Sequence, residues 1–198
     1  MGRRKIIEDG QLLAKARDIF MREGIAVGSR QIAQEIGISS SVLFQRFGSK
    51  EDLFFAAMTP PAPDLAALLT RDDADDPAEA RLARIAAGLL DYFRQLAPVL
   101  AALSTHPAFH YPTFAERHPD AALETLTGEL MAALTEQHHN GEIDCPDPGP
   151  VVLNLIATAY ALAMFERIGV HNGQFDHSTV DALTRVLWHG IAPAAGTP

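Results

Sequence analysis

Apolar residues recur at intervals of three and four along most of the chain, which is the spacing of one face of an α-helix. The first such segment covers about residues 8–23, and Gly24 marks its end, because glycine readily adopts the left-handed conformation that closes a helix. Its apolar face is formed by Leu12, Leu13, Ala16, Ile19 and Phe20. Nearly every later segment between prolines shows the same period. The pattern therefore predicts an all-α protein.

Two short helices joined by a tight turn are predicted next. The first begins behind Ser29, a good N-cap residue, and ends at Gly37. Its apolar positions are Ile32, Ala33 and Ile36. The second begins in the serine run at residues 39–41 and buries Leu43 and Phe47. This is the layout of a DNA-reading helix-turn-helix, whose second helix enters a major groove about 12 Å wide.

A further helix from about residue 49 is predicted to connect this motif to the rest of the chain. Ser49 and Asp52 form a capping-box pattern at its start. Its apolar positions, which can pack on the first helix, are Leu53, Phe54 and Ala57. We therefore expect a three-helix helix-turn-helix DNA-binding domain with this connector in residues 1–58, and a larger helical domain in residues 59–198.

The larger domain is predicted to contain helices that start at proline or follow a loop. One begins at Asp76-Pro77 and continues to about residue 104, and Pro98 either kinks it or opens another helix. Residues 106–119, which are dense in histidine and aromatic side chains, are expected to be irregular. The remaining helices are expected at residues 120–139, 151–168 and 178–190.

Charge separates the N-terminal segment from the rest of the chain. Up to Lys50 there are nine basic and five acidic residues, a net charge of +4, although the whole chain carries −9. The remaining 148 residues hold seven basic and twenty acidic residues, a net charge of −13. Phosphate binding needs local cations, and an acidic body keeps the rest of a protein away from DNA. The charge distribution therefore supports DNA binding by the N-terminal domain alone.

The N-terminal residues resemble the tetracycline-repressor (TetR) family of bacterial regulators. The family signature, IA…GVS…LYxHFxxK, is matched over roughly the first 58 residues at Ile32, Ala33, Gly37, Ile38, Ser39, Leu43, Phe44, Arg46, Phe47 and Lys50. Phe44 stands where the family usually has tyrosine, so the hydroxyl that would reach a phosphate is missing. The resemblance implies that the larger domain binds a ligand and forms a dimer.

The resemblance and the helix faces together predict the residues that contact DNA. Arg30 can reach a guanine edge or a phosphate through its fork of donors. The predicted base-edge contacts are Ser40, Ser41 and Gln45, and Phe44 is left with ring contact to sugar or a thymine methyl. The predicted phosphate contacts are Ser29, Ser39, Arg46 and Lys50. Arg3, Arg4 and Lys5 are candidates for a flexible arm on the DNA.

The last two helices are predicted to form a homodimer. The helix over residues 151–168 is apolar on most of its circumference, and the family pairs these helices with their copies. A twofold dimer reads two half-sites, so the expected partner is a palindromic operator in double-stranded DNA. The apolar stretch at residues 151–165 contains Asn154 and is short for a bilayer, and the N-terminus lacks the apolar core of a signal peptide. We expect a cytoplasmic protein without a membrane partner.

A small-molecule effector is expected between the middle helices, as in the family. The candidate residues are Phe93, Leu96, Leu100, His106, Phe109, His110, Leu126, Leu130, Asn154, Thr158 and Tyr160. The net charge of −13 favours a neutral or cationic ligand over an anion. The expected function is a repressor that the ligand releases from its operator.

Other functions are weighed against this one. Two histidine groups could suggest metal, His106, His110 and His118, and His138, His139 and Cys145, but neither has the spacing of a zinc site. A di-iron helical enzyme needs two Glu-x-x-His pairs, and only Glu136 with His139 fits. We therefore expect no catalysis, metal or cofactor, whereas an activator or architectural DNA-binding protein without an effector stays open.

Overall fold

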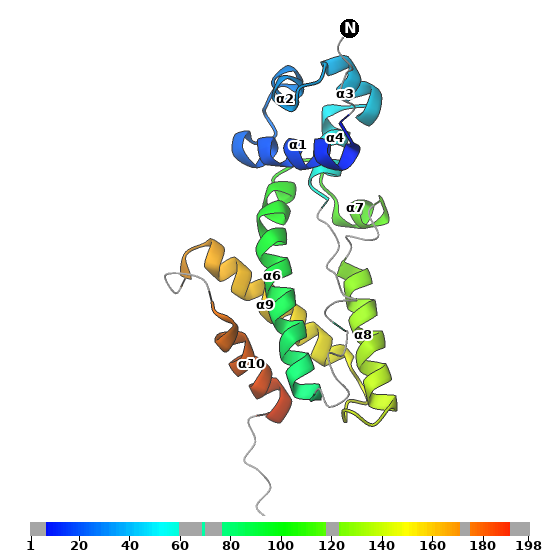
Figure 1. Ribbon diagram of the computed structural model, residues 1–198, viewed down its shortest axis with the longest axis vertical. Helices are drawn as coiled ribbons and strands as arrows, with labels where there is room; N and C mark the ends of the chain where they lie inside the picture. The colour runs from blue at the N-terminus through cyan, green and yellow to red at the C-terminus, as the bar shows by residue number, and fades with distance from the viewer. Residues whose placement is uncertain (1–6, 60–68, 70–76, 118–122, 171–174, 191–198) are drawn as a thin grey trace, which may run out of the picture. The chain divides into compact units, whose positions relative to one another are not determined.

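The computed structural model describes residues 7–59, 69, 77–117, 123–170 and 175–190. Within these ranges the regular elements are α-helices and there is no strand, which confirms the all-α prediction. The helices are α1 Asp9–Glu23, α2 Ser29–Ile36, α3 Ser40–Phe47, α4 Lys50–Ala57, α6 Ala78–Ser104, α7 Tyr111–Arg117, α8 Leu123–His139, α9 Gly149–Arg167 and α10 His177–His189 (Figure 1).

The chain divides into two compact units. Unit 1 comprises residues 1–60 and 99–118, and unit 2 comprises residues 61–98 and 119–198. The sequence predicts a single domain boundary near residue 58, whereas in the structure residues 99–118 belong to the same unit as the N-terminal helices. The reason is that Val99, Leu103 and Phe114 are buried in the core of unit 1. The functional boundary at residue 58 stays a prediction.

The core of unit 1 is built on the packing of α1 against α4. Phe20 of α1 meets Phe54 of α4 edge to face, with ring centroids 5.2 Å apart. Arg17 of α1 donates hydrogen bonds to the carbonyl oxygens of Ala57 (2.7 Å) and Thr59 (2.5 Å). Ala57 is the last residue of α4 and Thr59 follows the helix, so Arg17 binds carbonyl groups at the C-terminal end of α4.

Local turn chemistry sets the boundaries of the short helices. Gly37 closes α2 with a φ of +87°, and the Ser39 hydroxyl accepts a hydrogen bond from the Val42 amide at the start of α3. The Ser49 hydroxyl accepts from the Asp52 amide at 2.9 Å, which confirms the predicted cap of α4. The predicted cap at Ser29 is wrong. Gly28 is the N-cap and Ser29 is the first residue of α2, because the Gly28 carbonyl already accepts from the Ile32 amide.

Of the two alternatives at Pro98, the structure excludes the one in which it opens another helix, because Pro98 lies inside the single helix α6. One stretch differs from the expectation. Residues 111–117 form α7 in a stretch that was expected to be irregular. Pro112 is tolerated there because it stands in the first turn, where a backbone amide has no helical partner. The predicted start at residue 120 and His118 lie outside the described residues, as do Arg3, Arg4 and Lys5.

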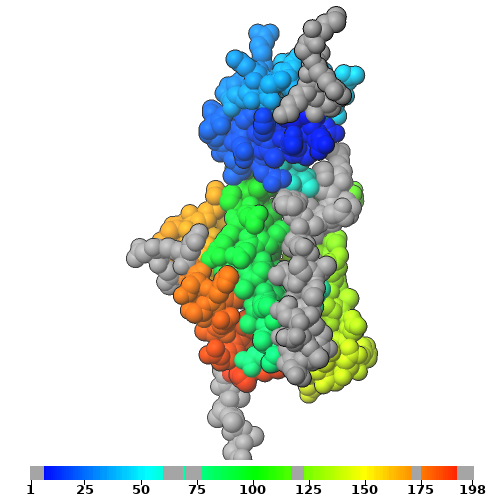
Figure 2. Space-filling view, in the orientation of Figure 1, coloured from blue at the N-terminus to red at the C-terminus, as the bar shows by residue number. Residues whose placement is uncertain are grey.

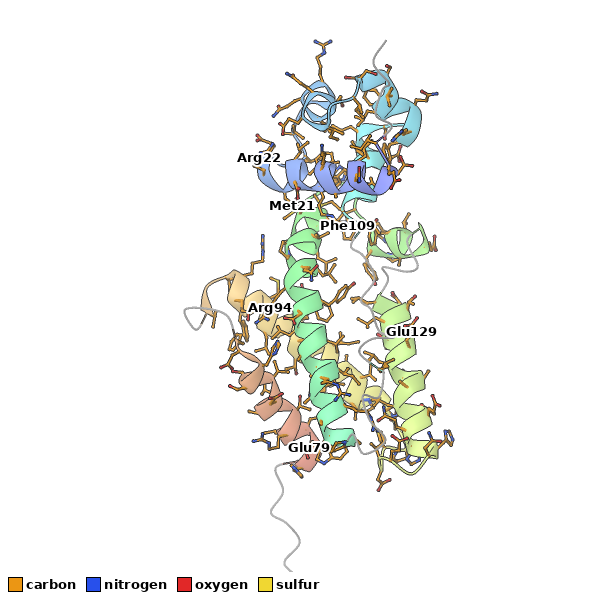
Figure 3. The ribbon with its side chains drawn as sticks, viewed as in Figure 1. Met21, Arg22, Glu79, Arg94, Phe109 and Glu129 are labelled. Carbon is orange, nitrogen blue, oxygen red and sulfur yellow. The ribbon has the colours of Figure 1, made fainter. Side chains whose placement is uncertain are left out.

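Unit 2 packs α8, α9 and α10 around the first 21 residues of α6. Its buried side chains include Leu82, Ile85, Leu89, Leu90, Phe93, Leu126, Leu130, Leu134, Val152, Leu155, Leu162 and Val180. Arg94 reaches from α6 to α9 (Figure 3), where its Nε and Nη2 bind the two carboxylate oxygens of Glu166 at 2.9 and 2.7 Å. Nη2 also donates to the Phe175 carbonyl, and the Phe175 amide donates to Glu166. This network fixes the segment before α10.

Candidate functional site

The outward face of α3 is the first part of the candidate DNA-binding surface. Ser41, Phe44 and Gln45 are exposed and Ser40 is half-buried, whereas Leu43 is only 1% exposed. The apolar side of α3 therefore anchors the helix in unit 1, and the other side presents two hydroxyls, an amide and one aromatic ring. Side chains of this size and chemistry can enter a major groove and contact base edges.

The other predicted DNA contacts, Ser29, Ser39 and Arg30, differ in whether their side chains already have partners within the protein. Ser39 caps α3, and its hydroxyl also lies 2.8 Å from that of Ser41. Ser29 is half-buried in the first turn of α2. Arg30 is exposed and has no hydrogen-bond or ion-pair partner among the residues that the structure describes. Its guanidinium is thus an exposed cation in the first turn of α2, and its contact with DNA stays a prediction.

The other two predicted phosphate ligands are bound to protein acceptors. The Lys50 ammonium donates to the carbonyl oxygens of Ile25 at 2.8 Å and Val27 at 3.3 Å. Arg46 donates from Nη1 to the Ile7 carbonyl at 2.8 Å and to the Asp9 carboxylate at 3.0 Å. The structure therefore gives both cations a role in holding loops of unit 1. Their contacts with phosphate stay predictions.

The cation at the end of α1 is neutralised within the unit. Arg22 binds Glu23 at 2.8 Å and Glu35 at 2.6 Å, and Gln31 also donates to Glu35. The hydrogen bond from Arg22 is the main cause that lowers the pKa of Glu35 below its usual value. Arg22 thus links α1 to α2 and is not counted among the DNA contacts.

The predicted effector residues do not come together in one place. Phe93, Leu96, Leu126 and Leu130 are buried in unit 2, and Tyr160 is 38% exposed with its ring against Phe93. Four other members of the set belong to unit 1: Leu100, His106, Phe109 and His110. His106 stacks on Phe54, Phe109 packs on Phe114, and His110 is exposed.

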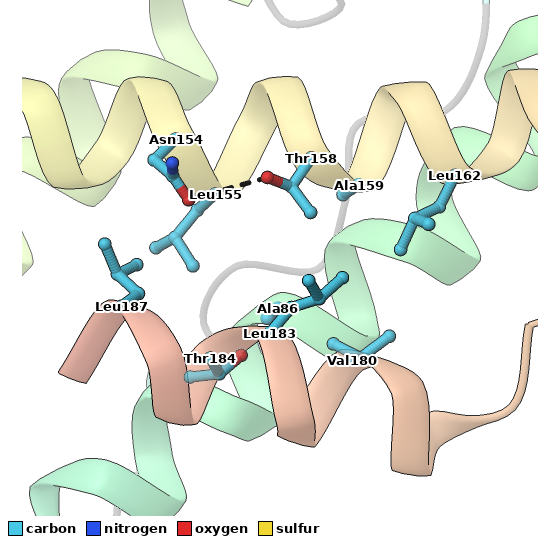
Figure 4. A pocket seen from close by; sticks show the side chains of 10 residues that line it. All are labelled: Ala86, Asn154, Leu155, Thr158, Ala159, Leu162, Val180, Leu183, Thr184 and Leu187. Atoms are coloured by element: carbon cyan, nitrogen blue, oxygen red, sulfur yellow. Dashed lines mark hydrogen bonds between the residues drawn. The ribbon is translucent and has the colours of Figure 1, made fainter. Parts of the chain in front are cut away.

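Two of the predicted effector residues line a small cavity of unit 2. Asn154 and Thr158 of α9 stand at a groove between α9 and α10, and their side chains are 3.5 Å apart (Figure 4). The free volume of this groove is about 20 Å³, which is room for about one water molecule. The other residues that line it are Ala86, Leu155, Ala159, Leu162, Val180, Leu183, Thr184 and Leu187.

A larger cavity of about 340 Å³ lies elsewhere in unit 2. It is lined by Ala78, Leu82, Leu134, Gln137, Ile143, Asp144, Cys145, Val151, Leu187 and Trp188. None of these residues was predicted to bind a ligand. Its walls come from α6, α8, α9, α10 and the loop before α9, and no motif or period in the sequence connects these segments.

Metal ligands are not assembled in the described part of the chain. It contains no group of three or more histidine, cysteine, aspartate or glutamate side chains that could hold an ion. Glu136 and His139, the pair considered for a di-iron site, both belong to α8, and His139 is exposed at its end. His138 instead serves the loop after α8, where its Nδ1 lies 3.3 Å from the Cys145 amide nitrogen.

Comparison with known proteins relates the N-terminal helices to a family model and the fold to solved structures. Residues 12–57, which span most of α1 and all of α2 to α4, match the family model of bacterial regulatory proteins of the tetR family. The whole chain has the fold of solved TetR-type regulators. A putative TetR-family transcriptional regulator from Mesorhizobium loti superimposes with a TM-score of 0.71 at 17% identity, over 93% of this chain and 96% of that one.

Two further structures show the same relationship. The TetR-family regulator PfmR from Thermus thermophilus has a TM-score of 0.64 at 17% identity, over 92% of this chain and 99% of that one. The transcriptional regulator FadR from Bacillus subtilis, solved with stearoyl-CoA, has a TM-score of 0.65 at 16% identity, over 93% and 100%. The N-terminal helices thus match the family model of tetR-type regulatory proteins, and the chain shares the fold of solved TetR-type regulators.

Proposed function

We propose that this protein is a cytoplasmic repressor that binds a palindromic operator as a homodimer and leaves it when a small molecule binds to unit 2. The observation that carries the proposal is the outward face of α3. Ser41, Phe44 and Gln45 are exposed there, on a helix that the buried Leu43 anchors in a domain of a DNA-binding family. Gln45 is assigned to a base edge and Arg30 to a guanine or phosphate.

Dimerisation is supported by the surfaces of α9 and α10. Leu153 and Ile168 at the two ends of α9 are 69% and 66% exposed, and Val186 and Leu183 of α10 are 52% and 41% exposed. In Figure 2 the C-terminal part of α9 and the helix α10, both orange to red, lie side by side next to α6 (green). Large apolar side chains at these exposures favour a contact with a second protein surface. We assign that surface to the same helices of a second copy, because an isologous contact yields the twofold symmetry of a palindrome.

The composition of α9 also allows another environment. By length and hydropathy α9 is the one helix in the described part of the chain that could cross a membrane. Its inner side, however, packs into unit 2 through Val152, Leu155 and Leu162. A helix with one side buried in a protein core and apolar residues on the other fits a dimer of a DNA-binding protein better than a lipid environment.

We assign the effector to unit 2, and we derive its charge from the net charge of the chain after Lys50. FadR from B. subtilis was solved with stearoyl-CoA, an anionic thioester, in a chain of the same fold. Here the part after Lys50 carries a net charge of −13, so we propose a neutral or cationic ligand. The last residues of α6 belong to the core of unit 1, where Val99 and Leu103 are buried. A ligand that shifts α6 can therefore change how unit 1 holds its α3 helix.

Selection from random duplex DNA tests this function. The purified full-length protein is expected to enrich an inverted repeat with half-site centres about 34 Å, or a multiple of one helical turn, apart. Binding of the selected duplex should weaken steeply as salt is raised, because released counterions supply much of the affinity. Recovery of no preferred sequence, or equal binding to a scrambled duplex of the same composition, would contradict the proposal.

A further inference from the structure

The cavity of about 340 Å³ in unit 2 has the composition of a binding site for a small organic ion. We propose that it binds an apolar organic monocation, with Asp144 as the counter-charge and Trp188 as an aromatic wall. None of the predicted effector residues lines this cavity, although Leu187 lines both it and the groove at Asn154 and Thr158. The proposal deepens the proposed function by naming a ligand class and a site in unit 2, and its test needs no DNA, so it can fail while the repressor function holds.

The walls of the cavity are mostly apolar. Leu82 of α6 and Leu134 of α8 are 6% and 3% exposed, so one side of the cavity is continuous with the core of unit 2. Trp188 of α10 is 38% exposed and lines another side. Ligand sites of a few hundred Å³ are commonly apolar with a small number of polar groups that orient the ligand. The size and lining of this cavity match that description.

The charged residues in the lining determine whether the cavity favours a positively or a negatively charged ligand. Among the described residues that line the cavity, Asp144 is the only one with a formal charge, and Gln137 adds a neutral amide. Burial, with the nearby carboxylates of Asp147 and Asp144, raises the pKa of the Cys145 thiol, so this side chain is uncharged at neutral pH. Arg81, a buried cation that directly precedes Leu82 in the sequence, forms an ion pair with Glu142.

The combination of a carboxylate and an indole favours a cation over other ligands. A cation near an indole ring is attracted by the negative face of the π system. An anion would meet the Asp144 carboxylate without a cation in the described lining to offset the repulsion. A neutral molecule would gain only from burial of its apolar surface. The expected order of affinity is therefore cation, neutral molecule, anion.

The loop that carries Asp144 and Cys145 is held in place before any ligand binds. The Glu142 amide donates to the Gln137 carbonyl at 2.9 Å, and the Cys145 amide lies 3.3 Å from Nδ1 of His138. At the other end, the Asp147 carboxylate accepts a hydrogen bond from the amide of Gly149, the first residue of α9, at 3.1 Å. A preordered wall lowers the entropy cost of binding.

The chain offers a reporter on each side of the cavity, because it contains one tryptophan and one cysteine. The probe is benzyltrimethylammonium, and the matched ligands are neopentylbenzene, its neutral isostere, and phenylacetate, an anion. We expect the cation to change Trp188 fluorescence saturably, with a Kd about fivefold lower than that of the neutral isostere. It should also slow the reaction of Cys145 with a maleimide. A non-saturable response, or phenylacetate binding as tightly as the cation, would overturn the proposal.

Substitutions separate a specific site from surface adsorption. D144N should remove the preference for the cation over its isostere, whereas E129Q, the same loss of charge on the exposed surface of α8, should keep it. Ala78→Phe should fill the cavity and abolish the fluorescence response. Ala80→Phe, on an exposed position of α6 outside the lining, is its control. Wild-type selectivity in D144N, or wild-type binding in a folded Ala78→Phe protein, would refute the site.

Discussion

The imidazole ring of His106 lies nearly parallel to the phenyl ring of Phe54, with centroids 5.4 Å apart and an angle of 28° between the planes. Phe54 also meets Phe20 edge to face. The histidine has a local role as well, since its Nδ1 accepts a hydrogen bond from the Ala108 amide at 3.1 Å. One side chain thus closes the turn after α6 and covers the aromatic core of unit 1.

Removal of this ring should weaken unit 1. His106→Ala loses an aromatic contact and the acceptor for the Ala108 amide, so we expect a loss of about 1–2 kcal/mol in the free energy of unfolding. His106→Phe should recover the stacking part of that loss. Urea unfolding followed by circular dichroism measures both changes. His110→Ala, at an exposed position in the same segment, is the control, and an equal loss in that variant would contradict the assignment.

Lys50 should affect stability as well as DNA binding. Its ammonium donates to two carbonyl groups of the loop between α1 and α2, so Lys50→Ala leaves the Ile25 and Val27 carbonyls without this partner. We expect unfolding to become easier by about 1.5–3 kcal/mol. The thermal unfolding midpoint reports this change, with the exposed Lys15→Ala as control.

DNA binding separates the two roles of Lys50. If the ammonium also contacts a phosphate, the variant loses affinity for all sequences alike and its salt slope falls by about 1. If Lys50→Ala is as stable as the wild type, the two carbonyl contacts contribute nothing to the free energy of unfolding.

Gln45 should determine sequence preference more than affinity. Its exposed amide on α3 can pair with a base edge, and such contacts discriminate by about 1–3 kcal/mol. Gln45→Ala should therefore relax the preference at one or two symmetric positions of the selected operator while binding to unrelated duplex stays the same. Competition with single-base operator variants measures this effect. Gln11→Ala, an exposed glutamine on α1, should leave the profile unchanged.

The parts of the fold that could be predicted are those set by neighbours in sequence. The glycine turn at Gly37 and the caps at Ser39 and Ser49 depend on three or four residues, and all are present. The partners of Lys50 and Arg46 lie 23 to 39 residues away, so the pattern alone could not show that both cations already bind carbonyl groups. The same holds for the cavity, whose walls come from distant segments.

The α7 helix and the effector residues illustrate another limit. A helix of seven residues has little stability of its own, and the burial of Phe114 in unit 1 holds it. Residues of the His106 to His110 segment share the aromatic composition of a ligand pocket, but composition does not tell a pocket from a core. His106 in particular was a candidate ligand contact and is packed on Phe54.

Acid should weaken unit 2 through Glu166. Hydrogen bonds from Arg94 are the main cause that lowers the pKa of Glu166 below its usual value of 4.5. A carboxyl whose pKa is lowered by folding contributes stability above its unfolded pKa, and that stability is lost as the pH falls through the lower, folded value. Stability measured from pH 7 to pH 3 should therefore fall less steeply in Glu166→Gln than in the wild type.

The same variant should also be less stable than the wild type at neutral pH. Glu166→Gln should lose about 2 kcal/mol, because Arg94 keeps only part of its partners. The exposed Glu129→Gln on α8 serves as the control and should follow the wild-type acid profile. A Glu166→Gln protein with an unchanged slope below pH 4.5 would show that this ion pair does not set the acid response.

The dimer surface makes the sharpest prediction for DNA binding. Val186 is 52% exposed on α10, and a carboxylate in its place would be buried without a partner if α10 meets its copy. Val186→Asp should therefore shift the protein from dimer to monomer, with a mass of 21.4 kDa in light scattering at micromolar concentration. It should also lose operator affinity, because one α3 helix reads only a half-site.

A matched substitution shows whether this effect belongs to the proposed interface. Met131 is 38% exposed and belongs to α8, so Met131→Asp adds the same charge at an apolar surface position that is not on α9 or α10. This variant should remain a dimer and bind the operator as the wild type does, because its carboxylate stays in water. Dissociation by Met131→Asp but not by Val186→Asp would place the dimer interface on α8 instead of on α9 and α10. A wild-type protein that is itself a monomer would contradict the proposal that a twofold dimer binds the operator.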